Sequence, residues 1–114
     1  MRIHYLEIVT KDVDAVCNTW EQLQDLTFRT EPALGNARVT ELAGGGLLGV
    51  RAPMHEQETP VVRPYFLVSD IEKAVRKEVE NGAELAHEPM ELPGQGKFAI
   101  LIQGGIQHGL WQTD

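Results

Sequence analysis

The sequence predicts a small α+β fold built from two copies of a strand-helix-strand-strand-strand (βαβββ) module. Three observations support this prediction: a weak internal repeat, two amphipathic helical segments, and short apolar segments separated by turn residues. A chain of 114 residues is long enough for one domain of this kind. We expect residues 1–52 to form the first module, residues 53–61 a linker, and residues 62–114 the second module.

The internal repeat is visible at both ends of the modules. Each copy begins with an apolar strand, then a Thr or Ser, then an Asp that opens a helix. That residue is Asp12 in the first copy and Asp70, 58 residues later, in the second. The closing strands correspond as well, because Gly49 lies 60 residues before Gly109. Few residues are identical, but the order and spacing agree, which is typical of a repeated structural unit.

Two segments have the apolar spacing of amphipathic helices. The expected buried faces are Val13, Val16, Cys17, Trp20 and Leu23 in the first, and Ile71, Ala74, Val75 and Val79 in the second. Thr10 or Asp12 can cap the first helix, and Ser69 or Asp70 the second, because their side-chain oxygens accept hydrogen bonds from free amides of the first turn. Gly82 is the expected end of the second helix.

Short strands are expected after each helix. They fall near residues 26–30, 38–42 and 47–52 in the first module, and near residues 84–86, 98–103 and 107–112 in the second. Turn residues separate them, among them Gly44-Gly45-Gly46. The polar stretch between Pro53 and Pro60 is interpreted as the connection between the modules.

Charge and hydropathy exclude several classes of function. The formal net charge is −7 and the basic residues are scattered singly, so the sequence lacks the basic surface that nucleic-acid binding needs. No run approaches the roughly 18 apolar residues of a membrane-spanning helix, and the first residues do not resemble a signal peptide. Cys17 is the single cysteine, which fits a reducing compartment. We therefore expect a cytoplasmic protein that binds neither nucleic acid nor membrane.

Three segments together resemble the vicinal oxygen chelate superfamily, also called the glyoxalase/bleomycin resistance/dioxygenase superfamily. They are Glu7–Val13, Tyr65–Ile71, and the closing stretch from Phe98 to Gln112. The resemblance covers nearly the whole chain. It implies two paired βαβββ modules, each of which curls its sheet into a half-open barrel, with a cleft where the sheets meet.

Metal enzymes of this superfamily carry four ligands, one on the first and one on the last strand of each module. The resemblance maps these positions to Tyr5, Gly49, Pro64 and Gly109, where the family uses His, Glu or Gln. One of the four is a phenol and three have no donor side chain, whereas a divalent metal needs several N, O or S donors. The sequence therefore looks more similar to the metal-free, ligand-binding branch, which includes bleomycin-resistance-type proteins. We expect no metal and no cofactor.

Strand alternation indicates which side chains line the cleft, because every second side chain of a strand faces the same side. The expected ligand-binding set is Tyr5, Glu7, Gly49, Arg51, Pro64, Phe66, Gln107, Gly109 and Trp111. It combines apolar walls with a few polar groups, as small-molecule sites do. We also expect the two glycines to leave space in the cleft. The alternative is that Phe66 and Trp111 simply fill the barrel.

Three functions are compatible with the sequence. The first, which we predict, is a protein that binds a small organic molecule in the metal-free cleft. The second is a metal-independent enzyme, of the lyase or isomerase type, in which Glu7 is the general base and Tyr5 a further acid–base group. The alternative for Glu7 is a purely structural role, in an ion pair with Arg51 or a hydrogen bond from the backbone. The third function is a metalloenzyme with non-standard ligands.

The four histidines do not cluster in the sequence pattern. His108 is expected on the helix-facing side of its strand, as a hydrogen-bonded core or interface residue. His4 is expected to point away from Tyr5, towards the helix or solvent. The resemblance also implies a homodimer, in which open sheet edges are covered.

Overall fold

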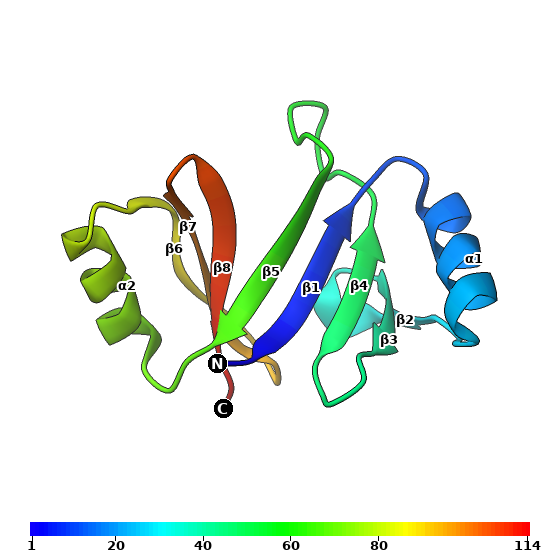
Figure 1. Ribbon diagram of the computed structural model, residues 1–114, viewed down its shortest axis with the longest axis horizontal. Coiled ribbons are helices and arrows are strands. Elements are labelled where there is room, and N and C mark those ends of the chain that lie inside the picture. Colours follow the sequence, from blue (N-terminus) through cyan, green and yellow to red (C-terminus); the bar gives the residue numbers. More distant parts are fainter. The chain divides into compact units, whose positions relative to one another are not determined.

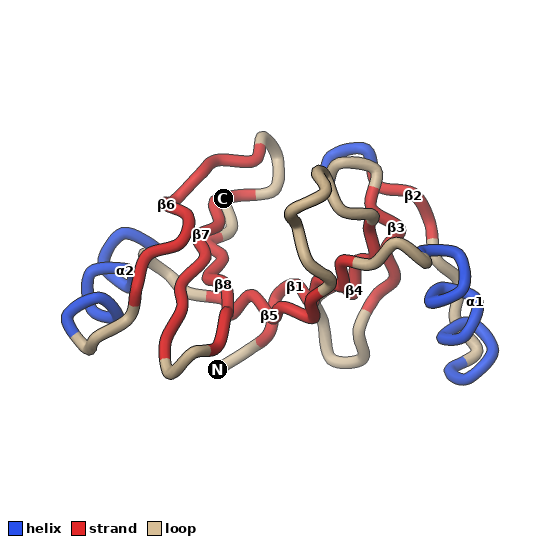
Figure 2. The backbone as a smooth tube through the Cα atoms, turned by 90° about the horizontal axis from the view of Figure 1, so that it is seen from above, coloured by secondary structure: helices blue, strands red, loops and turns tan.

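A computed structural model describes residues 1–114 as an α+β chain (Figure 1). The elements are β1 Ile3–Val9, α1 Val13–Gln24, β2 Arg29–Glu31, the 3-10 turn η1 Pro32–Leu34, β3 Ala37–Glu41, β4 Leu47–Arg51, β5 Val61–Leu67, α2 Ile71–Glu80, β6 Glu84–Leu92, β7 Gly96–Gln103 and β8 Ile106–Gln112. Each half of the chain follows the predicted order of one strand, one helix and three strands. Figure 2 shows the same order along the backbone.

The chain divides into two compact units. The N-terminal unit is Tyr5–Val62, and the C-terminal unit is Arg63–Asp114 together with Met1–His4. In the N-terminal unit the strand order is β2-β3-β4-β1, with β1 parallel to β4 and the other neighbours antiparallel. In the C-terminal unit the order is β5-β8-β7-β6, with β5 parallel to β8 and the other neighbours antiparallel. The two units therefore share one topology.

The core of the N-terminal unit lies between α1 and its sheet. Its buried residues are Cys17, Phe28, Leu48 and Val50, surrounded by Leu6, Ile8, Val13, Val16, Leu26 and Leu42. On β1 these core residues alternate with Tyr5, Glu7 and Val9, which are also buried. The period of two therefore gives β1 a helix-facing side and an opposite side that is buried as well.

The core of the C-terminal unit has the same arrangement around α2. Its buried residues are Ile71, Val75, Ala83, Ala99, Leu101 and Leu110, with Phe66, Val68 and Ala74 packed against them. The expected cap is confirmed, because the Asp70 side chain accepts a 3.1 Å hydrogen bond from the Lys73 amide. Gly82 follows the helix with a φ of 97°, a left-handed conformation that glycine adopts without strain.

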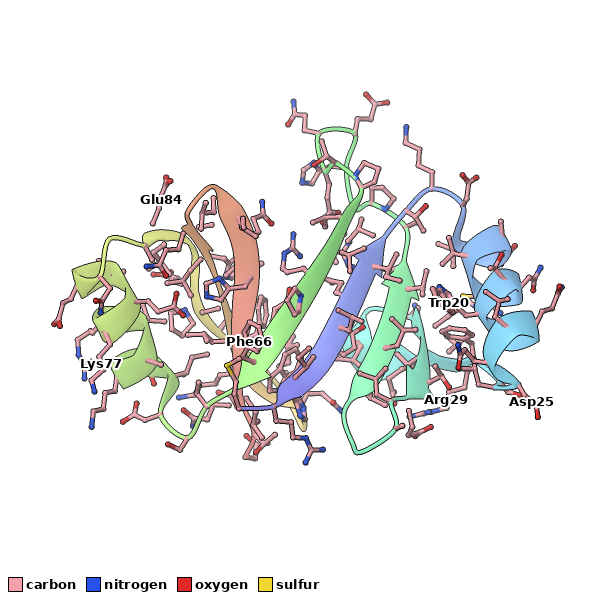
Figure 3. All side chains as sticks on the ribbon, viewed as in Figure 1. Trp20, Asp25, Arg29, Phe66, Lys77 and Glu84 are labelled. Atoms are coloured by element: carbon pink, nitrogen blue, oxygen red, sulfur yellow. The ribbon has the colours of Figure 1, made fainter.

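The first helix departs from the sequence prediction in two ways. Trp20 is 36% exposed and Leu23 66% exposed, and Cys17 is the only residue of α1 that is fully buried. Figure 3 shows Trp20 beside α1. The N-cap Asp12 makes no capping hydrogen bond, and its amide instead donates to the Thr10 hydroxyl at 3.1 Å. The hydrophobic spacing thus located the helix correctly but overestimated its burial.

The strands also differ in length from the prediction. β6 has nine residues where three were expected, because it continues through Pro89 with two register shifts against β7. Bulges of this kind let an edge strand accommodate irregular residues, including proline. β2 has only three residues. Neither helix has the length and hydrophobicity that crossing a membrane requires.

Candidate functional site

In the N-terminal unit, the sheet face opposite α1 carries Tyr5, Glu7, Gly49 and Arg51, as expected from strand alternation. β1 and β4 are paired so that Glu7 lies beside Gly49. The space above Gly49 is not empty, because a Cβ atom there would overlap the hydroxyl and Cζ of Tyr5. The expectation that this glycine leaves room in the site is therefore wrong: the tyrosine ring occupies the room.

Arg51 links two carboxylates on this face. Its Nε donates to Glu7 Oε2 at 2.8 Å. Its two terminal nitrogens bind Glu58 as a fork, with Nη1 to Oε1 at 2.9 Å and Nη2 to Oε2 at 2.7 Å. All three side chains are at most 17% exposed. The ion pair with Arg51 is the structural role that the sequence offered as an alternative to Glu7 acting as a general base.

This arrangement shifts three pKa values. Hydrogen bonds from Arg51 lower the pKa of Glu58 to about 2, and the Met54 amide adds a further bond to the charged form. The same bond with Glu58 raises the pKa of Arg51, so the guanidinium stays charged. Burial, and secondarily the charge of Glu7, raises the pKa of the Tyr5 phenol. Tyr5 is consequently neutral at physiological pH. Its hydroxyl can donate or accept a hydrogen bond, but it does not act as a phenolate base.

In the C-terminal unit the structure corrects the register of β5. The strand alternates between buried Arg63 and Tyr65 and the less buried Pro64 and Phe66. Phe66 packs against the core under α2, so it lies on the helix side, and Pro64 shares that side by alternation. The expectation that these two residues line the site face is wrong, and Arg63 and Tyr65 take their place.

The difference arises because the sequence comparison aligned the first strand of the second module one residue too late. Both copies have three residues between the first strand and the helix, so the 58-residue spacing of the two helix-opening Asp residues extends back through the strand. Under that spacing Tyr5 corresponds to Arg63, not to Pro64. A shift of one residue moves every side chain of a strand to the other face. The signal was present in the sequence, in the spacing of Asp12 and Asp70.

Tyr65 and Trp111 dominate the site face of the C-terminal unit. A Cβ atom at Gly109 would overlap the Tyr65 ring, so the room beside this glycine is filled as well. The rings of Tyr65 and Trp111 meet edge to face, with centroids 5.6 Å apart. Phe98 of β7 contacts both rings at 6.1 Å. Trp111 is 3% exposed and its Nε1 donates to the Gln95 carbonyl at 2.8 Å, so its indole is part of a packed aromatic cluster.

Arg63 adds a buried charge to this cluster. It is 7% exposed, and its Nε and Nη2 donate to Gln107 Oε1 at 3.1 and 2.9 Å. Its Nη1 lies 3.4 Å from the Tyr65 hydroxyl. Gln107 is therefore on the expected face. Its partner Arg63 is not among the predicted site residues, because the predicted register of β5 places Pro64 there.

The histidines lie apart, as expected. His108 Nε2 lies 2.9 Å from Glu78 Oε1 of α2, which confirms a hydrogen-bonded residue on the helix side. His4 contacts the Trp111 ring at 5.4 Å rather than a helix, and burial lowers its pKa. His87 stacks on Phe98 at 5.1 Å.

The corrected positions do not fit a metal ion. The four positions that the superfamily resemblance assigns to ligands hold Tyr5, Gly49, Arg63 and Gly109. Two of them have no side-chain donor and are covered by tyrosine rings. The guanidinium of Arg63 is a permanent cation without a lone pair. No group of three or more His, Cys, Asp or Glu side chains is arranged to hold a metal.

The architecture of each unit defines the class of fold, which is the βαβββ unit of the glyoxalase/bleomycin resistance type, and the four positions mapped to metal ligands hold one tyrosine, one arginine and two glycines. No protein-family model and no curated protein matches the sequence. Solved structures do match. A hypothetical protein, BH1468, from Bacillus halodurans C-125 has a TM-score of 0.76 at 15% identity, over 99% of this chain and 94% of that one.

Two methylmalonyl-CoA epimerases are similar as well. The enzyme from Mycobacterium tuberculosis has a TM-score of 0.72 at 14% identity, over 98% of this chain and 87% of that chain. A Streptomyces coelicolor variant in complex with 2-nitronate-propionyl-CoA has a TM-score of 0.67 at 14% identity, over 99% and 97%. At these identities the similarity shows the fold, which is that of the vicinal oxygen chelate structures and confirms the predicted fold class.

Proposed function

We propose that this chain binds a small organic molecule without a metal ion, using the sheet faces opposite the two helices. The observation that carries the proposal is the burial of charged side chains there. Glu7 and Arg63 are each 7% exposed, although burying a charge costs several kcal/mol before its partners compensate. Charged groups held by fixed partners are among the polar groups that orient a ligand in small-molecule sites. A solved structure of this fold holds an organic molecule, which supports the same assignment.

Each unit offers its own chemistry for a ligand. In the N-terminal unit this is a guanidinium between carboxylates, and in the C-terminal unit it is an aromatic cluster beside Arg63 and Gln107. Aromatic walls with a few fixed polar groups suit a ligand that has a flat apolar part and a polar group. The ion pair between Arg51 and Glu7 makes us favour binding over catalysis by Glu7.

The first prediction concerns metal content. The purified protein is expected to carry no stoichiometric zinc, nickel, iron or cobalt, because glycines, a neutral phenol and a guanidinium occupy the four ligand positions. Elemental analysis of protein expressed in metal-supplemented medium provides the measurement. One equivalent of metal per chain that survives dialysis against a chelator would contradict the assignment of this site.

The second prediction tests ligand binding through tryptophan emission. A ligand that binds beside the aromatic cluster should change the emission of Trp111, whereas Trp20 on α1 should respond less. In a screen of small aromatic acids and amides, the response should be lost in Trp111→Phe and retained in Trp20→Phe. Circular dichroism checks that both variants fold, since Trp111→Phe also removes the bond to Gln95. A ligand whose response persists in Trp111→Phe places the binding site elsewhere.

The third prediction is the oligomeric state. We propose a homodimer, because each unit has an edge strand, β2 in the N-terminal unit and β6 in the C-terminal unit, whose backbone groups can be covered by a second chain. Sedimentation velocity at micromolar concentration should give about twice the 12.7 kDa mass of one chain. A single species at the mass of one chain would rule out the dimer at that concentration.

A further inference from the structure

We propose that Arg51 is the binding site for the carboxylate of a small-molecule ligand, and that Glu58 occupies this site as an internal substitute until the ligand arrives. The proposal rests on the binding function proposed above and names the chemical class of the ligand. It also assigns a role to the segment Ala52–Pro60, which contains no helix or strand.

The first step is the geometry of the Arg51–Glu58 contact. Two parallel hydrogen bonds of 2.9 and 2.7 Å join the two terminal nitrogens to the two carboxylate oxygens. This fork is the arrangement by which arginine recognises carboxylate groups in general, because the planar guanidinium and the planar carboxylate match in shape and charge. A ligand carboxylate would make the same two bonds in the same place.

The second step is that the recognition group stays in position without Glu58. Arg51 Nε is bound to Glu7 Oε2 at 2.8 Å, and Glu7 lies on β1, outside the segment that carries Glu58. This bond uses the Nε hydrogen, which the fork does not involve. The arginine is therefore preorganised, so an incoming carboxylate does not have to order it.

The third step is that Glu58 stands on a segment with little else to hold it. The side chains of Met54, His55, Glu56 and Gln57 are exposed, and Met54 is 74% exposed. Glu58 is instead only 17% exposed, and besides Arg51 it binds the Met54 amide at 2.8 Å. A segment without an apolar anchor can open at low cost once its carboxylate is replaced.

The fourth step is room for the rest of the ligand. A pocket of ≈ 350 Å³ lies within the N-terminal unit. Val13, Arg38 and Val50 line it on the α1 side of the sheet. Arg51, Ala52 and Met54 line it where the chain leaves β4, so a ligand bound to Arg51 would extend around the end of β4 towards α1. Its volume lies at the lower end of the range of small-molecule sites, and its walls are mainly apolar. Ala52 and Met54 belong to the segment that Glu58 holds, so displacement of Glu58 changes the wall of this pocket.

The test uses benzoate as the probe, with benzamide as its uncharged control. A tethered carboxylate competes with a free one at an effective concentration in the millimolar range or above, so removing it should raise affinity. We expect Glu58→Ala to bind benzoate about tenfold or more tightly than the unmodified chain in isothermal titration calorimetry. The Arg51 Nε–H signal in nitrogen-15 NMR spectra should shift in the same titration, and benzamide should cause no such shift.

The matched control is Glu56→Ala, which removes the same charge from the same segment but at an exposed side chain. Its affinity for benzoate should equal that of the unmodified chain. Equal gains in benzoate affinity in both variants would overturn the proposal, because they would reflect net charge alone. The absence of benzoate binding to Glu58→Ala would overturn it as well. If benzamide or another uncharged compound still changes Trp111 emission in that case, the proposed binding function stands and only the carboxylate assignment fails. If no compound binds either variant, both fail.

Discussion

Replacing Gly109 with alanine should destabilise the protein by about 2 kcal/mol. A Cβ atom at this position would overlap Cδ2 and Cε2 of Tyr65 and stand 2.7 Å from Cγ. The overlapping atoms are near the root of a ring that is 4% exposed and packed against Trp111. The ring has no free direction of movement. The melting temperature should fall by roughly 10 °C, as measured by circular dichroism.

Two comparisons make this prediction specific. In a Tyr65→Ala background the same glycine substitution should cost less than about 0.5 kcal/mol, because the clashing ring is gone. Gly49→Ala should cost less than Gly109→Ala in the unmodified chain, since there the overlap is with the hydroxyl and Cζ at the far end of Tyr5. An equal loss from Gly109→Ala with and without Tyr65 would show that backbone conformation, and not ring packing, requires this glycine.

Local patterns in the sequence predicted most of the fold. Apolar spacing located both helices, Asp70 is one of the two residues expected to cap α2, and Gly82 follows its C-cap Asn81. The same information does not reveal how deeply a helix packs, and Trp20, expected on the buried face, is 36% exposed. Burial depends on which residues of the sheet lie beneath the helix, and the core under α1 is formed with Leu48 and Val50 of β4.

The candidate site was predicted in part. The face shared by Glu7 and Arg51 follows from strand periodicity, and so does the position of Trp111. Two of its features do not follow from periodicity. The first is that the Tyr5 ring fills the room beside Gly49. This is a diagonal contact between β1 and β4, and it depends on the length of the ring. That Glu58 binds Arg51 depends on the path of an irregular segment, for which the sequence has no repeating pattern.

Removal of the Arg51 charge is the second large effect, and we expect Arg51→Met to lose about 3 kcal/mol at pH 7. The substitution removes the guanidinium that faces Glu7 and Glu58, whose side chains are 9% and 17% exposed. The control is Arg29→Met, which breaks a pair with Glu41 whose side chains are 50% and 73% exposed. That variant should change stability by less than about 0.5 kcal/mol, because exposed pairs are screened by water.

The pH dependence separates this explanation from a simple loss of packing. Glu58 has a folded-state pKa of about 2 against an ordinary value of 4.5, so its contribution to stability is complete above pH 4.5 and is lost as the pH falls towards 2. Without Arg51, Glu58 loses the hydrogen bonds that lower its pKa, so its carboxylate becomes protonated at a higher pH in the variant. The gap in unfolding free energy between the unmodified chain and Arg51→Met should therefore narrow between pH 5 and pH 2 in urea titrations. A gap that stays constant over that range would mean that the Arg51 side chain stabilises the unit by packing alone, and the ionic account of this face would be wrong.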